Sequence, residues 1–126
     1  MGLEELIYDE EEEFERIVDK VKKVVRVRKD GIPILVQKEK LTQAEQVACY
    51  LIGKYFAKIL NLTEKESATV KEIANELKLD PRIVSARLKD LNDNGLVERV
   101  GRGEYKILTI KLEEFVDKIL NKIENK

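Results

Sequence analysis

Several residue types on which enzymes rely are scarce or missing in this chain of 126 residues. It contains no histidine and a single cysteine, Cys49. Chemistry that depends on a histidine or on a pair of thiols is therefore excluded, and so is an internal disulfide. The chain also lacks a glycine-rich phosphate loop and a pair of carboxylates in an obviously apolar setting. We expect a protein that is not an enzyme and that uses no cofactor or metal.

Long hydrophobic runs are missing as well. The most apolar segment, residues 43–60, is of modest length and contains Lys54 and Lys58, which favours a buried helix over a membrane span. The first twenty residues are acidic, unlike a signal peptide, so we expect a cytoplasmic protein. Abundant Lys and Glu with one Met and one Cys are typical of thermophile proteins.

The net charge of −1 hides an uneven distribution. Residues 1–20 hold nine acidic and two basic residues, whereas residues 21–40 hold seven basic and two acidic residues. Residues 62–110 hold nine of each, so a positive field there requires local clustering. We expect the acidic run at residues 9–13 to be a solvated face. A basic run could contact phosphates or pair with the acidic segment of a partner chain; it comprises Lys20, Lys22, Lys23, Arg26, Arg28 and Lys29.

Residues 69–94 predict two helices joined by a tight turn. Thr69 and Glu72 have the spacing of a capping box and open the first helix. Asp80 is suited to cap the second helix, with Pro81 in its first position. Apolar residues at helical spacing define the buried faces, Ile73, Ala74 and Leu77 in the first helix and Val84, Leu88 and Leu91 in the second.

A β-hairpin is predicted directly after these helices. An Asn-Gly pair at residues 94–95 ends the second helix. Residues 96–100 and 104–109 are rich in β-branched and aliphatic side chains, and Gly101-Arg102-Gly103 between them supplies the tip. The predicted order is therefore helix, turn, helix and two-stranded ribbon.

The segment IANELKLDPRIVSARLKDLNDNGLVER resembles the winged helix-turn-helix superfamily of bacterial and archaeal transcriptional regulators. This resemblance implies a mainly α fold with a small β-wing, a domain over residues 41–110, and binding to double-stranded DNA by the helix from Pro81 to Asn94. The implied DNA-binding residues are Arg82, Ser85, Ala86 and Lys89 in that helix, with Arg102 and Lys106 in the wing. Position 86 often holds a long polar residue, whereas Ala offers only apolar contact, for example with a thymine methyl.

The central helix of this domain is predicted from a second capping box, Thr42 with Glu45, which opens a strongly apolar segment. We expect Cys49 to be a buried structural thiol. Three aromatic residues, Tyr50, Tyr55 and Phe56, could line an effector pocket but are expected in the core.

Two extensions flank the domain. Residues 1–40 predict an amphipathic helix over residues 3–24, then a hairpin around Lys29-Asp30-Gly31 with Pro33 in an edge strand. The alternative is a helix that ends near Val27 and an extended linker to Leu41. Residues 111–126 predict a last helix with an apolar stripe, Leu112, Phe115, Val116, Ile119, Leu120 and Ile123.

Uncovered apolar stripes on both terminal helices favour a homodimer, which would place two recognition helices on one face of a duplex. The predicted dimerisation residues are Leu3, Ile7, Phe14, Ile17, Val21, Phe115, Ile119 and Ile123. Alternatively, the two helices cover each other within one chain. Two functions fit: a dimeric repressor that covers promoter DNA, or a winged-helix interaction module within a transcription or other macromolecular assembly. We favour the first, although the neutral charge of residues 62–110 and Ala86 are features that fit the second.

Overall fold

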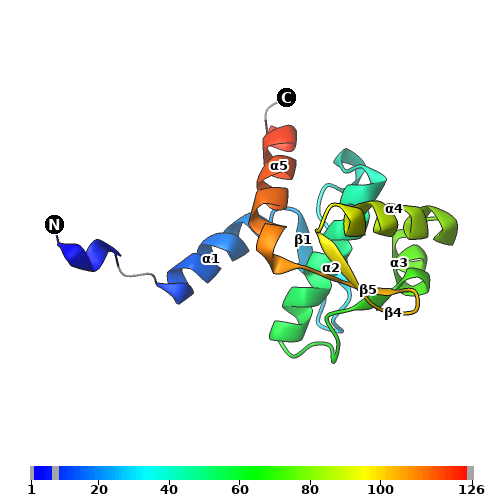
Figure 1. Ribbon diagram of the computed structural model, residues 1–126, viewed down its shortest axis with the longest axis horizontal. Coiled ribbons are helices and arrows are strands. Elements are labelled where there is room, and N and C mark those ends of the chain that lie inside the picture. Colours follow the sequence, from blue (N-terminus) through cyan, green and yellow to red (C-terminus); the bar gives the residue numbers. More distant parts are fainter. Residues whose placement is uncertain (1, 7–8, 125–126) are drawn as a thin grey trace.

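The computed structural model describes residues 2–6 and 9–124. Its α-helices are α1 (Glu10–Val21), α2 (Gln43–Ile59), α3 (Val70–Leu77), α4 (Pro81–Asp93) and α5 (Leu112–Glu124), and its 3-10 turns are η1 (Leu3–Leu6), η2 (Lys38–Lys40) and η3 (Thr109–Lys111). Strands β1 (Val25–Val27) and β2 (Pro33–Leu35) pair with each other, while β3 (Ala68–Thr69), β5 (Glu104–Ile107) and β4 (Val97–Gly101) form a second sheet in that order. Figure 1 shows α3, α4 and the β4–β5 wing on one side of α2. The predicted fold, mainly α with a small β-wing, is confirmed.

Helix α2 is the centre of the core. Both halves of its predicted capping box form, since Thr42 Oγ1 accepts from Glu45 N and Thr42 N donates to Glu45 Oε1. Cys49 is fully buried, and burial raises the pKa of its thiol to about 12. Gly53 allows the strand that contains Pro33 to pack closely against α2, because a Cβ at position 53 would lie only 2.5 Å from the Pro33 Cβ. None of the described helices has the length and apolar character needed to cross a lipid bilayer.

The prediction of one helix over residues 3–24 is wrong. The Asp9 carboxylate accepts hydrogen bonds from the backbone amides of Glu11 and Glu12, so a new helix begins at Glu10. This carboxylate satisfies free amides at the positive end of the helix dipole, which favours a helix start there. The helix ends at Val21, and the predicted seam residue Ile7 lies outside the described residues.

The hairpin at residues 25–35 is confirmed, and the linker alternative is wrong. Val25 pairs with Leu35 and Val27 with Pro33, and Arg28 N donates to Ile32 O across the turn. This two-stranded sheet lies against α2, which explains why three residues of Pro-containing strand are stable there.

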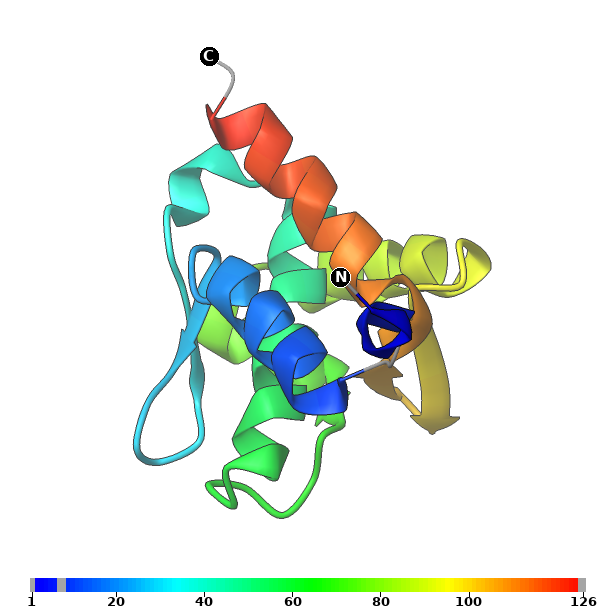
Figure 2. The ribbon, with the colours of Figure 1, turned by 90° about the vertical axis from the view of Figure 1, so that its left-hand side faces the viewer.

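Helices α1 and α5 join the same core as the winged domain. The stripe of α5 faces inward, with Val116 and Ile119 at most 1% exposed and Ile123 at 9%. Val21 of α1 is 5% exposed. Figure 2 shows α1 in front of α2. The premise that both stripes are uncovered is therefore wrong for Val21, Ile119 and Ile123, because their apolar surface is already buried within the chain.

The remaining predicted dimerisation residues are less covered. Ile17 and Phe115 are half-buried, Phe14 is 40% exposed, and Leu3 is 83% exposed. An apolar surface is thus left at the N-terminal end of the chain, before and within the first turns of α1.

Candidate nucleic-acid interface

Helix α3 is tied to α2 by a polar contact that replaces half of its expected capping box. Thr69 Oγ1 accepts from Glu72 N, as predicted, but the Glu72 carboxylate does not return to Thr69. It accepts a 2.7 Å hydrogen bond from the Tyr50 hydroxyl and lies 3.3 Å from Lys54 Nζ. Burial, then the bond to Glu72, raises the pKa of Tyr50, which keeps its hydroxyl a proton donor. This contact holds α3 against the central helix.

The turn into α4 forms as the sequence predicts. Lys78 adopts the left-handed conformation that ends α3, and Leu79 N donates to Ala74 O. Asp80 caps α4 by accepting from Arg82 N at 2.8 Å, with Pro81 in the first position. The inner face of α4 is fixed in the core, since Val84 and Leu88 are fully buried and Leu91 is 6% exposed.

The outer face of α4 is open to solvent. Four candidate reading residues are all exposed on this side, namely Arg82, Ser85, Ala86 and Lys89. The Arg82 guanidinium pairs with the Asp80 carboxylate, at 3.0 Å from Nη2 to Oδ2 and 3.3 Å from Nε to Oδ1. These bonds, with the one from the Arg82 amide, hold the pKa of Asp80 below its ordinary value.

The wing is formed by β4 and β5, with an irregular register between Arg99 and Gly101 that precedes the tip. Arg102 is exposed at the tip. Lys106 is less available, because its side chain is 35% exposed and its Nζ lies 3.7 Å from a Glu66 carboxylate oxygen and 3.9 Å from one of Glu98.

Two residues of this surface escaped the sequence reasoning. Arg99 is exposed on β4, and its Nε donates to Gly101 O at the base of the tip. A cation in the first wing strand beside the predicted tip was the signal for it. Asp80 was recognised as a cap but not as a partner of Arg82, although its position two residues before an arginine allows both contacts.

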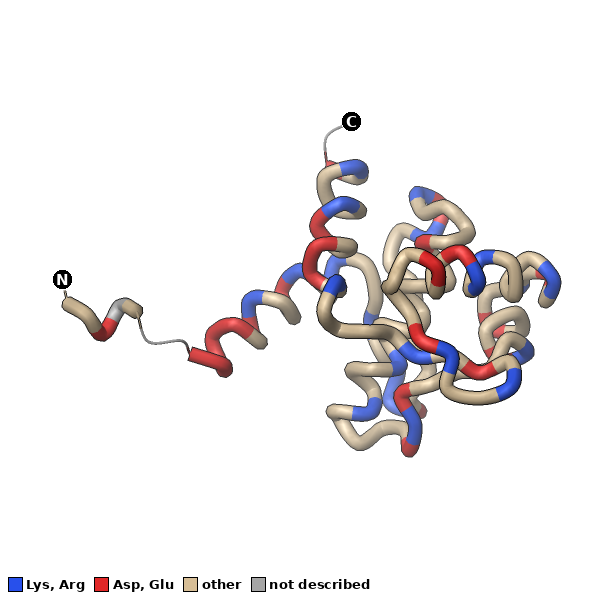
Figure 3. The backbone as a smooth tube through the Cα atoms, in the orientation of Figure 1, with Lys and Arg blue, Asp and Glu red and all other residues tan. Residues whose placement is uncertain are grey.

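Charges of both signs mark α4 and the wing in Figure 3. Within the described part of the chain, Lys89, Arg99 and Arg102 have no ion-pair partner within 4 Å. Residues 80–107, which contain α4 and the wing, hold six basic and five acidic residues, and three of the cations have no such partner: one on α4 and two on the wing.

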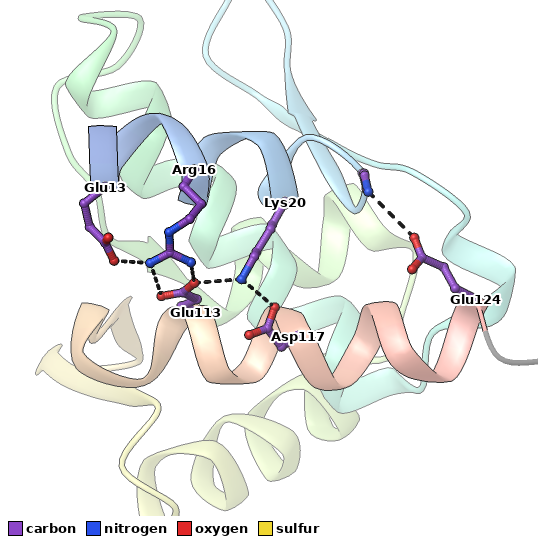
Figure 4. A network of polar contacts seen from close by, with 7 residues as sticks. Glu13, Arg16, Lys20, Glu113, Asp117 and Glu124 are labelled. Atoms are coloured by element: carbon purple, nitrogen blue, oxygen red, sulfur yellow. Dashed lines mark hydrogen bonds and ion pairs between the residues drawn. The ribbon is translucent and has the colours of Figure 1, made fainter. Parts of the chain in front are cut away.

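Four residues of the basic run at residues 20–29 form ion pairs within the chain, namely Lys20, Lys22, Lys23 and Arg28. Lys20 Nζ lies 2.7 Å from Glu113 Oε2 and 3.0 Å from Asp117 Oδ1 of α5, and Arg16 also pairs with Glu113 (Figure 4). Hydrogen bonds from Arg16, then Lys20, hold the pKa of Glu113 below its ordinary value. Other ion pairs within the chain join Lys22 to Asp19, Lys23 to Glu124 and Arg28 to Asp30.

Comparison with known proteins agrees with this geometry. Residues 57–99 match the family model described as bacterial regulatory protein, arsR family. The match runs from the end of α2 through α3 and α4 into β4. No curated protein and no solved structure gave a significant match.

Fold and family match together define the class. The chain carries a winged helix-turn-helix domain of the superfamily of transcriptional regulators, as its helix-turn-helix segment predicts. DNA binding in the regulation of transcription is the function of that class.

Proposed function

We propose that the protein is a homodimeric transcriptional repressor that reads duplex DNA with the outer face of α4 and the wing around Arg102. One observation carries this proposal: α4 is anchored by Val84 and Leu88, both fully buried, while its opposite face is exposed along its length. A helix presented in this way fits a major groove, and a neighbouring hairpin can reach the flanking backbone or minor groove.

The exposed residues divide into two roles in this proposal. Arg82 lies in the first turn of α4, where recognition helices contact base edges, and Ala86 offers a methyl group to a thymine methyl. Lys89 and Arg102, which have no ion-pair partner among the described residues, neutralise phosphates. Arg99 of β4, which is also exposed and has no ion-pair partner among the described residues, would do the same.

The dimer is proposed to form through the N-terminal segment. An apolar groove lies between α1, β1 and the end of α2, lined by Phe14, Val18, Val25, Phe56, Ile59 and Leu60. Arg26 and Lys22 lie at its edge, whereas the N-terminal segment carries exposed Leu3 and Leu6 beside Glu4 and the glutamates that open α1. This complementarity of apolar groups and charge favours a second copy, whose N-terminal segment would lie in the groove.

Removal of the two exposed leucines tests the dimer. Because Leu3 and Leu6 are more than 80% exposed, serine at both positions should leave the monomer folded and shift sedimentation equilibrium toward monomer. A matched control places serine at Ile34 and Ile110, which are also exposed but lie outside the groove. A wild-type protein that is monomeric at every concentration would contradict the dimer.

Selection of bound duplexes from a random pool tests DNA binding and symmetry together. We expect a palindromic consensus, since two copies related by a twofold axis read two equal half-sites. Transcription in vitro from a promoter that carries this consensus should fall when the protein is added. A rise in transcription would contradict repression.

One observation favours the second candidate function, protein contact within a macromolecular assembly. Residues 62–110 have no net charge, and Lys106 is engaged by Glu66 and Glu98. If fluorescence anisotropy detects no duplex binding at low salt, where the phosphate contribution is greatest, this second function is supported instead.

A further inference from the structure

The first turn of α4 contains a paired arginine in an unusual position. The Asp80 carboxylate accepts three hydrogen bonds from Arg82 alone: Oδ1 from the backbone N at 2.8 Å and from Nε at 3.3 Å, and Oδ2 from Nη2 at 3.0 Å. Two parallel bonds of this kind hold a guanidinium in one plane. The Arg82 side chain is nevertheless 91% exposed, so it is held without being covered.

The donors that Asp80 leaves free have a defined arrangement. A guanidinium has five N–H groups, and Asp80 engages Nε–H and one N–H of Nη2. The edge formed by Nη1 and Nη2 keeps two parallel donors. That edge matches the O6 and N7 acceptors which guanine presents in the major groove, and it matches no other base as well.

The pair is better suited to a base than to a phosphate. Asp80 and Arg82 together carry no net charge, so the pair gains little from releasing counterions, which is the main source of affinity in phosphate contacts. An arginine already held in one orientation loses less side-chain freedom when it binds, and this favours a directional contact.

We propose that Asp80 positions Arg82 to read a guanine in the major groove, which makes Asp80 a positioning residue and Arg82 a specificity-determining residue. The proposal rests on the proposed function, because it requires α4 to enter the groove. Arg82 lies in the first turn of α4, the part of a recognition helix that contacts base edges.

Base substitution in a selected duplex tests the contact. The probe is the duplex enriched by the wild-type protein from a random pool, in which we expect one guanine per half-site that depends on Arg82. Its replacement by adenine should weaken wild-type binding about tenfold or more, as expected for loss of a bidentate contact. Replacement of this guanine by 7-deazaguanine, which removes only the N7 acceptor, should weaken wild-type binding by less than replacement by adenine does. Arg82→Ala should abolish both differences.

Asp80→Asn tests the positioning role separately from the cap. Asparagine caps helices about as well as aspartate, so α4 should remain folded by circular dichroism. The asparagine amide cannot accept with both atoms, so the guanine-to-adenine ratio of affinities should fall several-fold. Asp80→Ser, which also caps but has a single short hydroxyl, should have the same effect. Asp90→Asn is the matched control: it removes an equal charge from α4 beside Arg87 and should leave the ratio unchanged.

The outcomes separate this proposal from the one it rests on. If no duplex is enriched, the proposed function fails and the guanine contact with it. If a duplex is enriched but no guanine in it depends on Arg82, only the reading role is overturned. If folded Asp80→Asn keeps the full preference that Arg82→Ala loses, Arg82 reads without help and the positioning role is overturned.

Discussion

The α4–wing surface and the α1–α5 surface use similar side chains in opposite ways. Between α1 and α5, Arg16 and Lys20 are both engaged by Glu113. On the α4–wing surface, Lys89 and Arg102 have no such partner within the described residues. Surface ion pairs add little stability but neutralise both of their charges, whereas unpaired cations remain free for a polyanion. Charge counts alone do not distinguish these two uses.

The largest expected effect comes from neighbouring positions on opposite faces of α4. Leu88→Ala should lower the free energy of unfolding by about 2–5 kcal/mol, because it leaves a cavity beneath the helix. Lys89→Ala should change it by less than about 0.5 kcal/mol, because Lys89 is a surface residue. Urea denaturation followed by circular dichroism measures both. Equal losses would mean that the outer face of α4 also supports the fold.

The next effect separates the two surfaces by their response to salt. Lys89→Ala and Arg102→Ala should each reduce the slope of log affinity for duplex DNA against log salt by about one unit. Lys20→Ala, on the α1–α5 surface, should leave the slope unchanged because Lys20 is paired with Glu113 and Asp117. Fluorescence anisotropy over a salt series gives the slopes. An equal reduction of the slope for Lys20→Ala would show that the two surfaces do not differ in their response to DNA.

A smaller effect is expected within the wing. Lys106→Ala should reduce the salt slope by clearly less than Arg102→Ala, because the Lys106 ammonium already lies between Glu66 and Glu98. The same anisotropy series measures it. Equal reductions would show that Lys106 leaves its carboxylates when DNA binds.

The smallest effect concerns the link between α1 and α5. Because ion pairs lower the pKa of Glu113, they stabilise the folded state above the ordinary glutamate pKa of about 4.3 and lose this contribution as pH falls through the lowered value. Glu113→Gln should therefore lower the melting temperature slightly at pH 7 and have little further effect in acid. Thermal melts at both pH values give the comparison, with Glu114→Gln as the control. A constant difference would assign the loss to packing instead.

The winged segment was predictable because its signals are local. Asp80 and Pro81 start α4, Thr42 and Glu45 start α2, and each cap acts within one helical turn of its own backbone. The family match over residues 57–99 falls on the same segment from which the superfamily was predicted. Exposure of the candidate residues on α4 followed directly from helical periodicity.

The errors arose where distant segments meet. The sequence of the apolar stripe on α5 is the same whether a partner chain or the same chain covers it. In the structure, Ile119 and Ile123 are buried by other parts of the same chain. Glu72 has capping-box spacing, yet its carboxylate accepts a hydrogen bond from the Tyr50 hydroxyl of α2 instead of returning to Thr69. The start of α1 was also missed, although its cause is local: Asp9 caps the helix directly before Glu10, the residue that interrupts the apolar period of residues 3–24.

The helices α2 to α5 with the β4–β5 wing, the buried faces of α3, α4 and α5, and the exposed face of α4 were determined by the sequence itself, since caps, turns and periodicity act over a few neighbouring residues. Tertiary structure alone decided which cations are paired, which apolar stripes are covered and how far Lys106 is available. Ion pairing and burial depend on surfaces brought together from distant parts of the chain, and no local pattern records which surfaces those are.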